Sequence, residues 1–355
     1  MNRTNDPGRT TGTNLLAVRG HNTALVLDLL RTAGADGISR LELAERTGLT
    51  PQAVSKITAR LREEGLAAEA GRRASTGGKP RTVLRLVPEA GHAVGVHLDR
   101  DELRVVLVRL DGRVAAERCT PLDLGAGTSE VVDGLVREVR GVLAEGVVGL
   151  LGVGVALPGP LDHTYGVLGR VTGFPDWDGF PLRDVLAREL DVPVVVDKDT
   201  NAAALGLSVA GEGGSFAYLH LGTGLGAGLV IAGTVHRGAR TGAGEFGHQV
   251  ILLDGPPCPC GKSGCVEALC LAALDRGDPE EAARVLGVGA ANLVGLLDID
   301  RVLLGGRRVE QTPEVFVRGV SAEVGEVPVR LADGGVRGVA VGAAQLRLGE
   351  VFGRG

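Results

Sequence analysis

The chain has 355 residues, enough for about two or three domains, and its 44% of hydrophobic residues excludes a wholly disordered protein. Aromatic residues make up only 3%, whereas glycine occurs 57 times, which argues against an aromatic surface for single-stranded nucleic acid. The net charge of −5 is unevenly distributed: residues 1–88 carry 14 Lys and Arg against 8 Asp and Glu, and the remainder carries 24 against 35. We therefore expect only the basic N-terminal part to meet a polyanion.

Two stretches bear on where the protein works. Residues 1–14 are polar and predict a flexible N-terminus without the apolar core of a signal peptide. Residues 213–236 are uncharged and long enough to span a bilayer, but their glycines and histidines favour a strand, a turn and a second strand. We expect a soluble, cytoplasmic protein.

Residues 15–88 predict a winged helix-turn-helix domain, which begins with three short helices. Apolar residues at helical spacing indicate the first helix over 23–33. Ser39 and Glu42 have the spacing of a capping box, in which each side chain accepts a hydrogen bond from a backbone amide, and they start the second helix. Thr50 is the expected N-cap of the third helix, because the proline after it suits a first turn, where no backbone N–H is needed.

The third helix and the two strands expected at 66–70 and 81–87 suit DNA binding. The helix presents polar side chains for the major groove, and the loop between the strands forms a basic wing. The residues predicted to contact DNA are Thr50, Gln52, Ser55, Lys56, Arg60, Arg72, Arg73, Lys79 and Arg81. The alternative is a small helical module for protein contacts, and the basic charge of this domain favours DNA.

Residues 89–355 alternate strands and helices, which predicts an α/β effector domain of two lobes with a cleft between them. The first lobe is expected to hold strands at 94–98, 104–110, 113–117, 151–156 and 192–196, and helices at 129–145 and 182–190. The second lobe is expected to hold strands at 216–221, 227–231 and 301–304, and a helix at 279–297.

Four of the five cysteines are clustered, which predicts a metal site in place of disulfides. His248, Cys258, Cys260 and Cys265 supply one imidazole and three thiolates, a closed tetrahedral set for a structural Zn²⁺ ion. The alternative is a group of unrelated buried thiols, but three cysteines within eight residues argue against it.

Three further groups indicate ligand binding near this metal site. The zinc turn would hold Glu245 and Glu267 near His248, where convergent polar groups suit the hydroxyls of a sugar, although either carboxylate could instead support the metal. Asp199 follows a strand at the edge where α/β sheets bind ligands, and it is a candidate general base or a helix cap. The alternating glycines of 222–228 could cradle a phosphate or form a plain hairpin.

Residues 242–267 read E-x-G-H followed by C-x-C-G-x-x-G-C-x-E, and in this they resemble the ROK family of repressors and sugar kinases. The resemblance is to the winged-helix transcriptional regulators of the family and extends from about Leu15 to Leu348. It also covers a second phosphate motif at 219–233 and an adenosine motif at 302–306. The resemblance implies an actin-like (ribonuclease H-like) fold with a sugar between two lobes, and a dimer or tetramer.

The resemblance also assigns site residues by position. The sugar contacts of the family fall on Asp199, Glu245, His248 and Glu267, and His248 would bind zinc through one ring nitrogen and the sugar through the other. In the kinases of the family, the residue at Asp199 is the base that deprotonates the attacking sugar hydroxyl. Lys198 replaces the usual Asn and only donates hydrogen bonds, so it implies a ligand other than a plain hexose or a pairing with Asp197.

Kinases of this family begin the domain with D-x-G-G-T, whose glycine-rich turn holds the phosphates of ATP. The same register here reads His97-Leu98-Asp99-Arg100-Asp101, which lacks both glycines and places two carboxylates where phosphate oxygens would lie. Each carboxylate about 4 Å from a phosphate costs roughly 1–4 kcal/mol. We therefore expect no ATP-dependent kinase activity and regard Asp199 as a vestigial base. The segment after Glu267 is also shorter than in relatives, which implies a trimmed second lobe.

Together these features predict a DNA-binding transcriptional regulator, a sugar-responsive repressor of carbohydrate metabolism or uptake genes. It would bind double-stranded operator DNA as a homodimer or homotetramer, respond to a sugar or sugar derivative, and carry a structural zinc ion at 248–265. One alternative is an ATP-dependent ROK-type sugar kinase with an N-terminal DNA-binding domain. Another is a regulator whose effector domain binds a protein partner.

Overall fold

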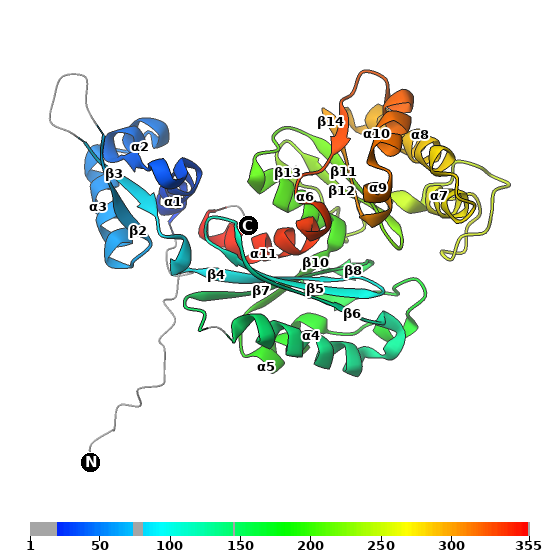
Figure 1. Ribbon diagram of the computed structural model, residues 1–355, viewed down its shortest axis with the longest axis horizontal. Helices are drawn as coiled ribbons and strands as arrows, with labels where there is room; N and C mark the ends of the chain where they lie inside the picture. The colour runs from blue at the N-terminus through cyan, green and yellow to red at the C-terminus, as the bar shows by residue number, and fades with distance from the viewer. Residues whose placement is uncertain (1–19, 74–80, 145, 354–355) are drawn as a thin grey trace, which may run out of the picture.

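The computed structural model describes residues 20–73, 81–144 and 146–353, which form an N-terminal head and two α/β lobes (Figure 1). The head contains three helices and a three-stranded antiparallel sheet in the order β1-β3-β2. The helices are α1 (His21–Ala33), α2 (Arg40–Thr47) and α3 (Pro51–Glu63). The strands are β1 (Ile38–Ser39), β2 (Ala67–Arg73) and β3 (Arg81–Leu86).

The starts of α2 and α3 follow from local sequence, as predicted. Ser39 Oγ accepts a hydrogen bond from the backbone N–H of Glu42 at 3.3 Å, and Glu42 Oε2 accepts one from the backbone N–H of Ser39 at 2.8 Å. Thr50 Oγ1 accepts a hydrogen bond from the N–H of Ala53 at 3.2 Å, and Pro51 is the first residue of α3. The capping box and the N-cap are both confirmed.

The first lobe is built on a five-stranded sheet in the order β10-β7-β4-β5-β6. Helices α4 and α5 cover one face of this sheet and α11 packs on the other (Figure 1). The main strands are β4 (His92–Leu98), β5 (Glu102–Arg109), β6 (Val114–Pro121), β7 (Leu150–Leu157) and β10 (Val194–Lys198). The short pair β8 (Leu161–Asp162) and β9 (Val167–Leu168) lies beside them, and the helices are α4 (Thr128–Leu143), α5 (Leu182–Leu190) and α11 (Gly338–Val351).

The second lobe has a five-stranded sheet in the order β13-β12-β11-β14-β15. Its strands are β11 (Phe216–Leu221), β12 (Leu225–Ile231), β13 (Thr234–Val235), β14 (Arg301–Gly305) and β15 (Val329–Leu331). Helices α7 (Val266–Asp275), α8 (Pro279–Leu297) and α10 (Pro313–Val324) pack on one face, α6 (Asp199–Ala210) packs on the other, and α9 (Arg307–Gln311) follows β14. Within the described ranges, no helix combines the length and apolar character needed to cross a membrane.

The two lobes are joined by the close packing of α6 against α11. A Cβ atom on Gly342 of α11 would lie 2.0 Å from the carbonyl oxygen of Ala202 in α6, and one on Gly206 of α6 would lie 2.9 Å from the Cα of Gly342. Only glycine allows this approach, because any side chain would force the two backbones apart. Since α11 also packs on β4 and β7, the helix pair links the two sheets.

The head shares its core with the first lobe. Val26, Leu27 and Leu30 of α1 are fully buried in one hydrophobic cluster that also contains Leu348 of α11 and Phe352 after it. The guanidinium of Arg31 lies 5.5 Å from the centre of the Phe352 ring. The head is therefore seated on the end of α11, beside the joint between the lobes.

The predicted elements agree with the structure in type, and several agree in extent. The helices expected at 182–190 and 279–297 and the strand at 216–221 have the predicted bounds. The strand expected at 192–196 is instead β10 (Val194–Lys198), which begins after Pro193, a residue with no N–H for the ladder. This shift makes Lys198 the last residue of the strand, directly before α6.

Candidate functional site

A cavity of about 770 Å³ lies between the two lobes, and residues from both sides line it. The five residues predicted to contact a sugar all line this cavity: Lys198, Asp199, Glu245, His248 and Glu267. They come from the junction of β10 and α6, from a short 3₁₀ turn at Phe246–His248 and the residue before it, and from the first turn of α7. The volume is typical of a small-molecule site.

Asp199 is the first residue of α6, and its carboxylate accepts a hydrogen bond from the N–H of Thr200 at 2.6 Å. Burial raises the pKa of Asp199 to about 7, although the hydrogen bond from Thr200 opposes this rise. The negative charges of Asp99 and Glu245 raise the pKa further, whereas Lys198 lowers it. At neutral pH the carboxyl group can therefore either donate or accept a proton, which suits contact with a hydroxyl group.

Lys198 lies in the cavity wall as the buried half of an ion pair whose other half, Glu245, is 44% exposed. Its side chain is 3% exposed, and Nζ donates to Glu245 Oε1 at 3.0 Å and to the carbonyl oxygen of Ala243 at 2.5 Å. The pairing with Asp197 that the sequence suggested is wrong: the Asp197 carboxylate pairs with Arg237 Nε at 2.7 Å. Successive side chains of a strand point to opposite faces, so neighbours in β10 face different partners.

Glu267 connects α7 to the glycine-rich turn between β11 and β12. Its Oε2 accepts a hydrogen bond from the N–H of Leu225 at 2.7 Å, and the side chain is almost completely buried. The backbone N–H of Leu225, where the turn ends, is therefore already hydrogen-bonded to a carboxylate of the protein. Gly224, in the same turn, lines the cavity next to this carboxylate.

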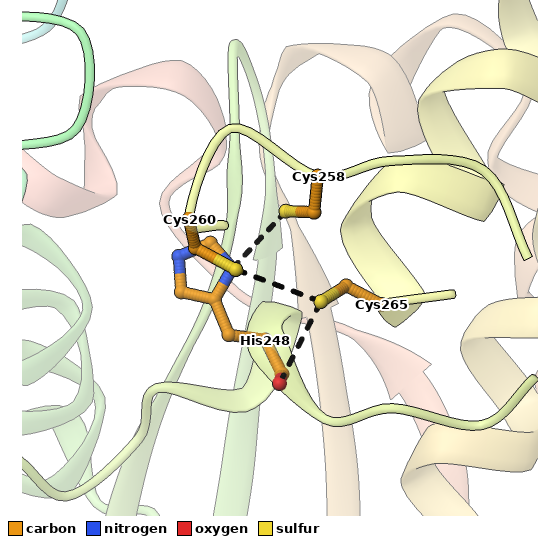
Figure 2. A group of neighbouring side chains, drawn as sticks. All are labelled: His248, Cys258, Cys260 and Cys265. Atoms are coloured by element: carbon orange, nitrogen blue, oxygen red, sulfur yellow. Dashed lines mark hydrogen bonds between the residues drawn. The ribbon is translucent and has the colours of Figure 1, made fainter. Parts of the chain in front are cut away.

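His248, Cys258, Cys260 and Cys265 come together as a group that can hold a metal ion (Figure 2). Their ligand atoms all lie within 4.8 Å of one another; Cys260 Sγ is 3.7 Å from Cys265 Sγ, and Cys258 Sγ is 3.6 Å from His248 Nδ1. A tetrahedral ion with bonds of about 2.3 Å needs ligands about 3.8 Å apart, so the donor set fits. Nδ1 faces the thiols, which leaves Nε2 of His248 for a second contact.

Gly264 explains the tight path of the metal turn. It has a φ of +69°, and a Cβ atom there would lie 1.6 Å from the carbonyl oxygen of Leu252. The turn brings Cys265 to the start of α7, two residues before Glu267. The metal cluster and the cavity are therefore built from one continuous piece of backbone.

The structure also places an arginine beside the cavity that the sequence analysis missed: Arg307, which does not line the cavity itself but pairs with Asp99, which does. Arg307 Nη2 lies 3.2 Å from Asp99 Oδ2 and also pairs with Asp101. Thr223 Oγ1 donates to Asp99 Oδ1 at 2.8 Å. Asp99 and Asp101 belong to the first lobe, and Arg307 and Thr223 belong to the second, so these contacts bridge the lobes. The position of Arg307 directly after the motif at 302–306 is the signal that could have found it.

The structure describes most of the residues predicted to contact DNA, and several of them are exposed. Gln52, Ser55, Lys56 and Arg60 are exposed on α3, and Thr50 and Arg81 are exposed at the starts of α3 and β3. The Arg60 guanidinium is already engaged, because Nη2 donates to Thr23 Oγ1 at 2.6 Å and Nε lies 3.8 Å from Glu64. Arg72 and Arg73 lie in β2, and Lys79 lies outside the described residues. Their contacts with DNA remain predictions.

Comparisons with known proteins agree with this architecture. The ROK family profile matches residues 93–274, and a winged helix-turn-helix DNA-binding profile matches residues 26–67. The xylose repressor of Caldicellulosiruptor bescii is 31% identical over 240 residues, which are 65% of this chain and 59% of that protein. The chain thus spans less than two thirds of the length of this curated relative.

Two solved structures show the same fold. The ROK hexokinase from Thermus thermophilus has 30% sequence identity and a TM-score of 0.61, over 73% of this chain and 99% of that one. A ROK family transcriptional regulator, a homolog of the E. coli MLC protein, has 21% identity and a TM-score of 0.75, over 94% of this chain and 98% of that one. The expected fold class, a winged helix-turn-helix followed by a two-lobed actin-like domain, is confirmed.

Proposed function

This chain belongs to the ROK family, and from that membership we propose that it is a transcriptional regulator, a sugar-responsive repressor of carbohydrate metabolism or uptake genes. One observation carries the proposal: the chain joins a DNA-binding type of head to a cavity in which Asp199, Glu245 and Glu267 converge. Carboxyl groups that accept and donate hydrogen bonds suit the many hydroxyls of a sugar. The likeness to a xylose repressor supports the same conclusion.

The head would bind double-stranded DNA with α3 in the major groove. Thr50, Gln52, Ser55 and Lys56 lie toward the N-terminal end of α3 and would meet base edges and phosphates. Arg81 and the arginines and lysine of the wing (Arg72, Arg73 and Lys79) would contact phosphates beside the groove. Arg60 would then act mainly by holding α3 against Thr23. Two heads of a homodimer or homotetramer would read the two halves of a palindromic operator.

Sugar binding would be transmitted through the joint between the lobes. Asp199 starts α6, α6 packs on α11 through Gly206 and Gly342, and the head rests on the end of α11. A change in lobe closure would therefore shift the seat of the head and the spacing of two heads on DNA. The usual allosteric coupling of about 1–3 kcal/mol would weaken operator binding about 5- to 150-fold.

A structural Zn²⁺ ion would complete the sugar site without entering any reaction. The fit of three thiolates and Nδ1 of His248 to a tetrahedral ion supports this assignment. Such an ion would hold the turn with Glu245 and His248 against the helix that carries Glu267. His248 Nε2 would remain available to the sugar.

A kinase is the second candidate, and two observations favour it. The pKa of Asp199 is raised by burial to about 7, which suits a general base, and a ROK hexokinase is 30% identical. Against it, Asp99 and Asp101 occupy the register of the family's first phosphate turn and are already paired with Arg307. Phosphates of ATP would have to displace this arginine and meet two carboxylates. We therefore propose a vestigial base and no kinase activity.

The test is thermal unfolding of the zinc-loaded protein with a panel of sugars, sugar phosphates and ATP. A ligand at 100 times its dissociation constant should add about 2.7 kcal/mol to the free energy of unfolding. Stabilisation by a sugar but not by ATP, with loss of the effect in Glu245→Ala, is the expected result. ADP release that needs both sugar and ATP and disappears in Asp199→Ala would establish the kinase instead. No response to any sugar would favour a protein partner for the effector domain.

A further inference from the structure

Most of the charged groups that line the cavity already have partners. Asp99 is paired with Arg307, and Glu245 is paired with Lys198. Glu267 accepts a hydrogen bond from a backbone amide of the glycine-rich turn. Two of the four cavity carboxylates, Asp99 and Glu245, are therefore balanced by ion pairs within the chain, whereas Asp199 and Glu267 accept hydrogen bonds from backbone amides only.

Arg100 lines the cavity without a direct ion pair, and the nearby Glu267 carboxylate, whose Oε2 lies 3.0 Å from the site of a Cβ atom on Gly224, is not bonded to it. Its guanidinium makes no hydrogen bond or ion pair with the residues that the structure describes. It lies 5.7 Å from the centre of the Phe174 ring, which positions it by a cation–π contact. Nη2 lies 3.6 Å from the site of a Cβ atom on Gly224, so the group reaches from the first lobe to the glycine-rich turn of the second.

Arg170 adds a second cation without a direct ion pair to the same cavity. It lies in the loop after β9, four residues before Phe174, and lines the cavity with an exposed side chain. Within the described part of the chain it too has no hydrogen bond or ion pair. Phe174, Arg100 and Arg170 all line the cavity from the first lobe, whereas Glu245, His248 and Glu267 line it from the second.

We propose that Arg100 and Arg170 form a subsite for an anionic group of the ligand, so that the cavity selects a sugar acid or a sugar phosphate over the corresponding neutral sugar. The inference rests on the proposed sugar-sensing function and names the class of sugar. Guanidinium groups bind carboxylates and phosphates through paired, charge-assisted hydrogen bonds. A neutral sugar that closed the lobes would leave Arg100 less hydrated and still unpaired, which is unfavourable.

The test compares matched ligands on the full-length, zinc-loaded protein. The probes are glucose, galactose and mannose, each with its uronate and its 6-phosphate, together with inorganic phosphate alone. Thermal unfolding is followed for the wild type, Arg100→Ala, Arg170→Ala and the control Arg318→Ala, an exposed arginine of α10 outside the cavity. We expect a charged member of one series to bind more tightly than its neutral sugar, and Arg100→Ala to weaken that binding about ten-fold or more.

The outcomes separate the inference from the proposed function. Preference for a uronate identifies a carboxylate subsite, and preference for a 6-phosphate identifies a phosphate subsite. Equal binding of the neutral sugar, or an anionic preference that survives in both cavity variants, overturns the inference and leaves the sensor intact. Binding of inorganic phosphate but of no sugar overturns both the inference and the proposed sugar-sensing function. The absence of any thermal shift with all three sugar series does the same.

Discussion

The contacts of Arg307 hold the two lobes together, and removing them should measurably destabilise the protein. Arg307→Ala deletes the ion pairs to Asp99 and Asp101 across the lobe boundary. The Asp99 carboxylate would keep two donors, Thr223 Oγ1 at 2.8 Å and the backbone N–H of Arg100 at 2.7 Å. The variant therefore removes the positive charge next to the buried Asp99 carboxylate but leaves two of its hydrogen bonds in place.

The expected magnitude follows from the burial of the two partners. The side chain of Asp99 is 13% exposed and that of Arg307 is 36% exposed, so one partner is desolvated and the other still touches water. Breaking a fully buried pair costs about 3–5 kcal/mol, and breaking a surface pair costs less than about 1 kcal/mol. Since Asp99 keeps two donors, we expect the free energy of unfolding to fall by about 1.5–3 kcal/mol.

Urea unfolding at pH 7 measures this loss, with the fluorescence of Trp177 as the signal. Trp177 is the one tryptophan of the chain and lies buried in the core of the first lobe. Arg308→Ala is the matched control, because Arg308 lies on the same helix and makes no ion pair in the described part of the chain. The control should lower the free energy of unfolding by less than about 0.5 kcal/mol. An equally small loss in Arg307→Ala would refute the role of its ion pairs.

Three further predictions concern single groups. Burial raises the pKa of Asp199 from 3.8 to about 7, so the free energy of unfolding of the wild type should fall as the pH rises between these values, whereas that of Asp199→Asn should not. The measurement is the urea midpoint of both proteins at pH 5 and at pH 8. An equal change of midpoint in the two proteins would contradict the prediction. Cys260→Ser should lower the thermal midpoint and abolish stoichiometric zinc, which a colorimetric zinc assay measures; a zinc-free wild type with an unchanged midpoint would rule the ion out. Lys56→Ala should lower affinity for duplex DNA and reduce the slope of log K against log salt by about one, measured by fluorescence anisotropy, whereas Arg318→Ala should behave as the wild type.

The sequence predicts best what is encoded locally. The capping box of Ser39 and Glu42 and the N-cap at Thr50 depend on residues three apart, and both occur as predicted. The four metal-ligand candidates lie within a short segment whose turn is forced by Gly264, so their convergence could also be predicted. These features need no knowledge of how the lobes pack.

Contacts between distant segments could not be predicted in the same way. The partner of Lys198 is 47 positions away in sequence, and that of Asp99 is 208 positions away. Both pairings depend on how two sheets are brought together by α6 and α11, which no local pattern specifies. The grouping of Asp199 with Glu267 came from the family resemblance, since spacing alone does not bring them to one cavity.

The shared core of the head and α11 has a consequence for how the protein is made. The ribosome delivers α1 early and α11 late, yet Val26, Leu27 and Leu30 of α1 belong to the same buried cluster as Leu348 and Phe352. During synthesis α1 can pack against α2, α3 and β3 as soon as they emerge, but the part of its surface that contacts Phe352 and Gly353 stays exposed until nearly the whole chain has been made. A nascent or interrupted chain would therefore carry the head without the C-terminal residues on which it rests. The contacts that fix the head on the two-lobed domain are complete only in molecules that contain this C-terminal segment.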